Sequence, residues 1–144
     1  MKRLFLLLAL LFSPVAALAE NTVEARDGWA WLEEDGRSVR IFAQILNTSR
    51  EEQTITGANF PADSAAIVSL MDGRSQTASF RLRRRNDLFL KPGHKHILVT
   101  GLSSPLQVGQ TIAVSLTLAS GEGVTFSALI RPEGLGGTGR IRRK

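Results

Sequence analysis

The chain contains 144 residues, none of them cysteine, and carries a formal net charge of +5 at pH 7. This length fits one domain with a core of its own. The lack of cysteine excludes disulfide bonds and thiolate metal sites, so a soft-metal site would have to use methionine and histidine. The basic excess has no interleaved aromatic residues, so we do not expect nucleic-acid binding.

Residues 1–19 have the pattern of a cleaved signal peptide. Lys2 and Arg3 precede an apolar run from Leu4 to Phe12, and Ala17-Leu18-Ala19 forms a small-x-small cleavage site. The run is too short to span a membrane, and no second apolar segment follows. We therefore expect a periplasmic or secreted mature chain that begins at Glu20 and has no transmembrane segment. The cleavage site lacks the cysteine that would mark a lipoprotein.

Beyond the signal, apolar residues alternate with a period of two. The alternation covers residues 39–46, 112–119 and 124–130, and turn clusters rich in Gly, Asn and Asp separate such segments. No helix of two or more turns is evident. About seven to nine short strands at this spacing predict an all-β antiparallel sandwich or barrel over residues 20–132. The clearest local prediction is the hairpin closed by Ser120 to Gly123.

Two basic segments stand apart from this pattern. Arg81, Arg83 and Arg85 alternate with Leu82, and on a regular strand they would share one face, which we interpret as solvated. Residues 133–144 are rich in glycine and arginine, which predicts a flexible basic tail. The functional alternative for the segment Arg81–Arg85 and for the tail is contact with an anionic surface or an acidic partner.

The two histidines and one methionine form a candidate metal site. His94 and His96 follow a Pro-Gly turn and would share one face of a strand. Met71, the only methionine after Met1, lies upstream. Imidazole and thioether are the donors that a cysteine-free protein can offer to copper. In the alternative interpretation, the histidines are surface polar residues and Met71 fills the core.

Catalytic motifs are lacking. The chain has no Gly-x-Ser-x-Gly elbow, no phosphate-binding glycine loop and no His-Glu-x-x-His zinc motif. Asp72 and Asp87 have the context of turn residues. Ser103 and Ser104 are candidate nucleophiles only if an acidic residue orients a histidine base, and no such acidic residue is evident. We therefore do not expect an enzyme.

Several short segments, in order from about Val23 to Pro132, carry a family resemblance. They are Trp29-Ala30-Trp31, Phe42 to Asn47, Thr56 to Pro61, Leu90 to Gly93 before His96, and the run Gly101-Leu102, Pro105-Leu106, Gly109. In these segments the chain resembles the PCu(A)C family of periplasmic copper chaperones. The resemblance implies a cupredoxin-like Greek-key β-sandwich. It also implies delivery of copper to an acceptor protein, such as a respiratory oxidase copper centre.

The copper motif of that family is degenerate in this chain. The family uses a His, a Met about eleven residues later, and a His-x-Met pair after the Pro-Gly turn. By resemblance, His96 matches the His of the pair, Leu98 replaces its Met, and Met71 stands at the first His. The downstream Met has no counterpart near Arg74. The expected ligands are therefore Met71 and His96, with His94 as the third candidate, and Cu(I) is favoured over Cu(II). The alternative is a divergent member that has lost copper and binds a periplasmic protein or an anionic surface.

Overall fold

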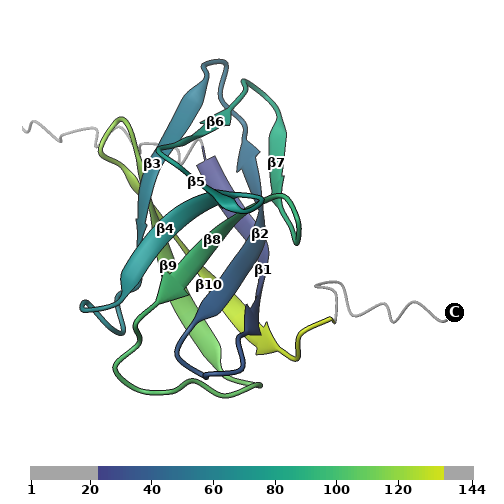
Figure 1. Ribbon diagram of the computed structural model, residues 1–144. Coiled ribbons are helices and arrows are strands. Elements are labelled where there is room, and N and C mark those ends of the chain that lie inside the picture. Colours follow the sequence, from purple (N-terminus) through teal and green to yellow (C-terminus); the bar gives the residue numbers. More distant parts are fainter. Residues whose placement is uncertain (1–22, 135–144) are drawn as a thin grey trace, which may run out of the picture.

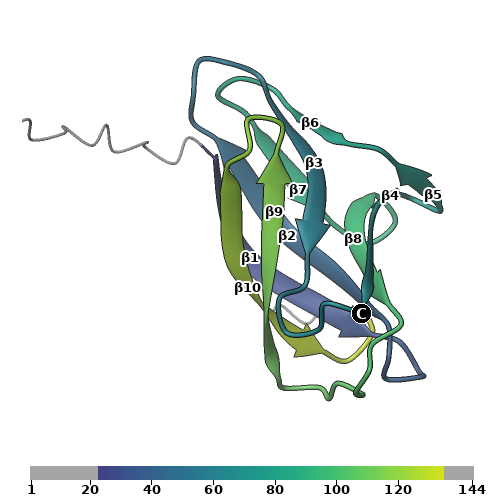
Figure 2. The same ribbon diagram turned by 90° about the vertical axis from the view of Figure 1, so that its left-hand side faces the viewer.

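The computed structural model describes residues 23–134, which form ten β-strands and no helix (Figure 1). The strands are β1 (Val23–Leu32), β2 (Val39–Asn47), β3 (Gln53–Asn59), β4 (Ile67–Asp72), β5 (Ser75–Thr77), β6 (Phe80–Leu82), β7 (Asp87–Leu90), β8 (Lys95–Thr100), β9 (Thr111–Leu118) and β10 (Gly123–Arg131). They pair in the order β5-β4-β8-β2-β1-β10-β9-β3-β6, and β7 pairs with β2. The sheet curls on itself, so β3 and β4 come into contact across the core (Figure 2).

The predicted all-β class is confirmed, with two differences in detail. The described strands number ten rather than seven to nine, because β5 and β6 have only three residues each and are too short to show an alternation. One pairing, between β1 and β10, is parallel. Residues 23–134 contain no helix long and apolar enough to cross a bilayer. The predicted signal peptide and nearly all of the predicted tail lie outside the described residues.

The alternating apolar residues fill the core, as their period of two predicts. The buried positions are Val39, Ile41, Ala43 and Ile45 in β2, Ile112, Val114, Leu116 and Leu118 in β9, and Phe126, Ala128 and Ile130 in β10. Burying each large aliphatic side chain stabilises the fold by about 1.5–3 kcal/mol. The predicted β9–β10 hairpin is also present, and the N–H of Gly121 donates to the carbonyl of Leu118 at 2.9 Å.

A second apolar layer covers the outer face of the sheet. Phe42 lies on the face opposite Ile41, yet its side chain is 0% exposed. Trp29 and Trp31 cover it, with ring centroids 4.5 Å and 5.3 Å from that of Phe42. A register shift in β1 between Arg26 and Trp29 precedes the two tryptophans. This cluster matters because His96 lies beside it.

The expected strand face of Arg81, Arg83 and Arg85 does not form. β6 ends at Leu82, and the three following arginines lie in the loop to β7, where Arg85 adopts a left-handed backbone with φ of 52°. A distant side chain binds the backbone at this point. The buried amide of Asn47 donates to the carbonyls of Leu82 and Arg83 at 3.1 Å and 3.2 Å, and so holds the chain where it leaves the ladder with β3.

Candidate metal centre

Met71 and His96 are direct partners in the sheet. β4 and β8 pair antiparallel, and their register sets Met71 opposite His96 (Figure 1). Directly opposed residues share one face, with Cβ atoms about 4.5–5.5 Å apart. Thioether and imidazole therefore start close enough to reach one ion, since first-shell metal bonds are about 2.0–2.3 Å.

The pair lies on the outer face of the sheet. The side chains of Ile97 and Val99 are 0% exposed and belong to the core. Because successive residues of a strand point to opposite faces, His96 and Leu98 face outward. One face of β8 therefore packs into the core through Ile97 and Val99. The other face carries His96 beside Met71.

The hydrogen bonding of His96 fixes which ring nitrogen is free. Its Nδ1 lies 2.9 Å from the carbonyl oxygen of His94. A carbonyl can only accept, so Nδ1 carries the proton, and in the neutral ring the lone pair is on Nε2. No group within residues 23–134 hydrogen-bonds this Nε2. An imidazole held by a carbonyl through one nitrogen is the usual arrangement of a histidine that ligates metal through the other.

His94 occupies a different place from the one its spacing predicts. β8 begins at Lys95, so His94 lies in the preceding turn, its side chain exposed, and does not share a strand face with His96. Its carbonyl accepts from His96 and also from the N–H of Gly73 at 3.1 Å. The backbone of His94 therefore joins the ring of His96 to the β4–β5 turn. Sequence reasoning missed this role, because it depends on the turn conformation.

Apolar side chains border His96, whereas Met71 also pairs with the polar Gln76 of β5. Leu98, half-buried, follows His96 on the same face and pairs with Ser69. On the other side, the ring centroid of Phe42 is 5.9 Å from that of His96, which is only 5% exposed. Within residues 23–134 no three His, Asp or Glu side chains converge as a metal-binding group. A site here would use one thioether and one imidazole, with the imidazole buried and the thioether half-buried.

The aromatic neighbours are functional candidates that the sequence interpretation did not single out as such. Trp29, Trp31 and Phe42 carried the family resemblance only as landmarks of the strands. In the structure they form one cluster whose Phe42 ring contacts His96, which is 5% exposed. An apolar shell of this kind controls solvent access and the local dielectric around a metal ligand.

Solved structures define the class of protein. The copper-bound PCuAC domain from PmoF2 matches with a TM-score of 0.67 at 14% identity, over 77% of this chain and 93% of that domain. The CuI-DR1885 solution structure from Deinococcus radiodurans matches with a TM-score of 0.61 at 20% identity, over 85% of each chain. The protein therefore has the PCuAC β-sandwich fold, and the expected cupredoxin-like architecture is confirmed.

The sequence defines the particular family. The family model described as "Putative lipoprotein LpqE-like" matches residues 23–130, so the chain belongs to the LpqE-like family. A protein of Leifsonia xyli subsp. xyli (strain CTCB07), "Putative lipoprotein Lxx21020", is 29% identical over 100 residues, 64% of this chain. The chain spans 60% of the length of that relative.

Proposed function

We propose that the protein binds one Cu(I) ion between the Sδ of Met71 and the Nε2 of His96 and carries it, outside the cytoplasm, to an acceptor protein. The observation that carries this proposal is the direct pairing of Met71 with His96 on the outer face of the sheet. The copper-bound PCuAC domain from PmoF2 and CuI-DR1885, which share the fold, support the choice of metal.

The donor set suits a transported Cu(I) ion. Thioether sulfur and imidazole are soft or borderline ligands, which favour Cu(I) over hard cations. Two donors from the protein leave a coordination position open, and an incoming donor of the acceptor can occupy it before either bond to Met71 or His96 is released. Leu98, which stands where the family motif has a Met, keeps this position open because its hydrocarbon side chain offers no lone pair.

His94 is the candidate for a third ligand. Its side chain is exposed on the turn that precedes β8, two residues before His96. A third donor from His94 would raise affinity and would compete with the acceptor for the open position. Replacing His94 by Ala separates the two arrangements, because only a three-donor site loses affinity.

The sequence pattern of residues 1–19 supports delivery outside the cytoplasm. The charged residues, apolar run and small-x-small motif of residues 1–19 have the pattern of an export signal. The family resemblance provides the class of acceptor, a respiratory oxidase copper centre. Cu(I) transfer to such a centre is then a ligand exchange between two exported proteins.

A competition titration with Cu(I) and Cu(II) tests the proposal. Residues 20–144, which contain all ten strands, are compared with His96→Ala, Met71→Leu and His94→Ala. Met71→Leu conserves side-chain volume, and Ile67→Leu, on the same face of β4, is the matched control without a lost donor. We expect one Cu(I) per chain and a loss of affinity of about tenfold or more for each missing ligand.

Each outcome has a distinct meaning. Weaker binding in both His96→Ala and Met71→Leu, with Ile67→Leu unchanged, supports the site. Loss of Cu(II) binding in both histidine variants, but not in Met71→Leu, points to a His-x-His site instead. No copper binding by the unsubstituted protein overturns the proposal.

A further inference from the structure

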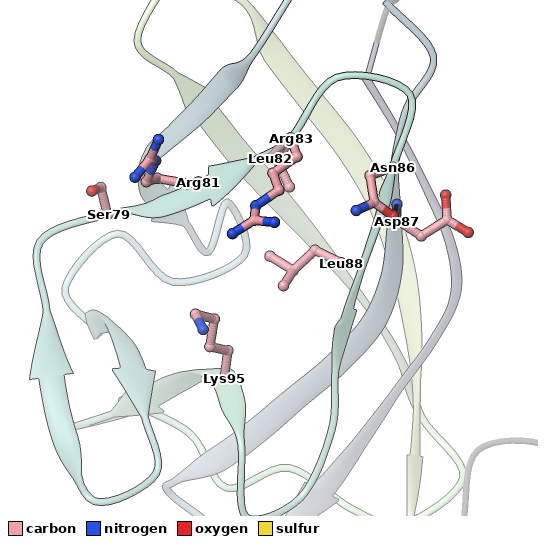
Figure 3. A pocket seen from close by; sticks show the side chains of 8 residues that line it. All are labelled: Ser79, Arg81, Leu82, Arg83, Asn86, Asp87, Leu88 and Lys95. Atoms are coloured by element: carbon pink, nitrogen blue, oxygen red, sulfur yellow. Dashed lines mark hydrogen bonds between the residues drawn. The ribbon is translucent and has the colours of Figure 1, made fainter.

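A second candidate site lies on the other side of β8. An open pocket of about 440 Å³ is formed by β6, the β6–β7 loop, β7 and the start of β8 (Figure 3). Its cationic and apolar lining includes Arg83, Leu88 and Lys95. Lys95 precedes His96 and so faces away from the Met71–His96 pair. The pocket is therefore separate from the proposed copper site.

Two cations enter this pocket without an acid between them. Arg83 and Lys95 reach into it from opposite sides, and Leu88 lies to one side of the space between them (Figure 3). The guanidinium of Arg83 has no hydrogen bond or ion pair to any residue in the described range 23–134. Within the described residues Lys95 forms an ion pair with Asp72 at the long distance of 3.7 Å, and the Asp72 side chain is 57% exposed. Such an exposed ion pair contributes little free energy, so it leaves Lys95 available to an anion.

The nearby carboxylates of Asp87 and Glu52 have hydrogen-bond partners outside this pair of cations. The carboxylate of Asp87 points away from the pocket and accepts a hydrogen bond from Gln44 at 3.0 Å (Figure 3). Glu52 also attracts Arg83 electrostatically, but both of its carboxylate oxygens are engaged by Arg81 through hydrogen bonds of 2.8 Å and 3.0 Å. Like charges that face one space repel each other, and a bound anion would turn that repulsion into attraction.

The loop that carries Arg83 is held in place. Asn47, which is 2% exposed, donates to the Arg83 carbonyl at 3.2 Å, and the N–H of Asn86 donates to the same carbonyl at 3.2 Å. The N–H of Arg85 donates to the carbonyl of Ser49 at 3.1 Å. These bonds fix the backbone before any ligand arrives, which lowers the entropy cost of binding.

We propose that this pocket binds a phosphate group, carried by an anionic lipid headgroup or by a free phosphate compound. The planar fork of Arg83 fits two phosphate oxygens, and Lys95 supplies a point charge from the opposite side. Ser79 and Asn86, which also line the pocket, add neutral donors. Leu88 offers an apolar surface to carbon atoms next to the phosphate.

Two probes distinguish the sources of the phosphate. Residues 20–144 are mixed with phosphatidylglycerol–phosphatidylcholine vesicles, with phosphatidylcholine vesicles alone, and separately with inorganic phosphate followed by amide NMR shifts. Binding to the anionic vesicles but not to inorganic phosphate would identify a lipid headgroup as the ligand. Binding to both probes would identify a site that also accepts free phosphate compounds. Binding to neither overturns the proposal.

Variants locate the binding in the pocket. Arg83→Gln and Lys95→Gln should each weaken binding about tenfold or more, as expected for a lost charge-assisted hydrogen bond. Arg40→Gln removes the same charge at an exposed ion pair with Glu33 on the outer face and should bind as the unsubstituted protein does. Equal binding by all three variants overturns the proposal, because other basic segments would then hold the anion. Cu(I) affinity should not change in Arg83→Gln. The phosphate proposal can therefore fail without affecting the copper proposal.

Discussion

Asn47 is the residue whose loss we expect to damage the fold most for its size. Its Nδ2 donates to the carbonyls of Glu51, Leu82 and Arg83 at 2.8 Å, 3.1 Å and 3.2 Å. Its Oδ1 accepts from the N–H and hydroxyl of Ser49 at 3.0 Å and 2.7 Å. One buried side chain thus joins the end of β2 to the β2–β3 and β6–β7 loops.

The cost of Asn47→Ala follows from these bonds. The contact with Leu82 is buried, so its carbonyl would lose its partner out of reach of water, at about 1–3 kcal/mol. The contacts with Glu51 and Arg83 are only partly buried, and each is worth about 0.5–1 kcal/mol. These contributions add to about 2–5 kcal/mol. A central value of about 3 kcal/mol is a large part of the about 5–15 kcal/mol that holds a typical domain folded.

Urea unfolding measures this loss directly. With a slope of about 1.5 kcal/mol per M, the midpoint of Asn47→Ala should fall by about 2 M. Asn47→Asp is the control, since it keeps the acceptor for Ser49 but replaces both donor hydrogens by a carboxylate facing carbonyls. It should be at least as unstable as Asn47→Ala. A midpoint for Asn47→Asp equal to that of the unsubstituted protein would refute the reasoning.

Two further predictions concern the metal pair and the loops. Leu98→Met restores a thioether on the face of His96 with little change in volume, so Cu(I) affinity in competition titrations should rise by about tenfold or more; unchanged affinity would show that Leu98 does not border the ion. The N–H of Ser103 donates to Asp63 at 2.6 Å, and this bond holds the pKa of the Asp63 carboxyl below its usual value. The ionised form therefore stabilises the fold above the unfolded pKa of about 3.9, and this contribution is lost as the pH falls through the lower folded pKa. In Asp63→Asn, stability should fall less steeply over that acid range, and parallel pH profiles of the urea midpoint would contradict this.

The sequence predicts the core better than it predicts the outer face. A period of two identifies Ile41 and Val114 as buried, because burial of one face of a strand is a local property. The same period assigns Phe42 to solvent, whereas two tryptophans of β1 cover it. That covering depends on the pairing of β1 with β2 and on a register shift, neither of which leaves an alternation in β2 itself.

The candidate sites divide in the same way. The motif of the related family identifies Met71 and His96, and the register of β4 against β8 then pairs them. The carbonyl role of His94 depends on a turn whose path the residue types do not specify. The strand predicted through Arg85 ends at Leu82, where the carbonyl accepts a hydrogen bond from Asn47, 35 positions away in the chain. Long-range contacts of this kind are not encoded in local patterns.

The most direct test of the copper site is the methyl signal of Met71. The chain has two methionines, and Met71 is the only one within residues 20–144, so methyl-labelled methionine gives a single assigned NMR resonance. We predict that this resonance shifts as one equivalent of Cu(I) is added, and that it stays in place under the same conditions in His96→Ala. Stoichiometric Cu(I) binding without any movement of the Met71 methyl signal would contradict a site shared by Met71 and His96.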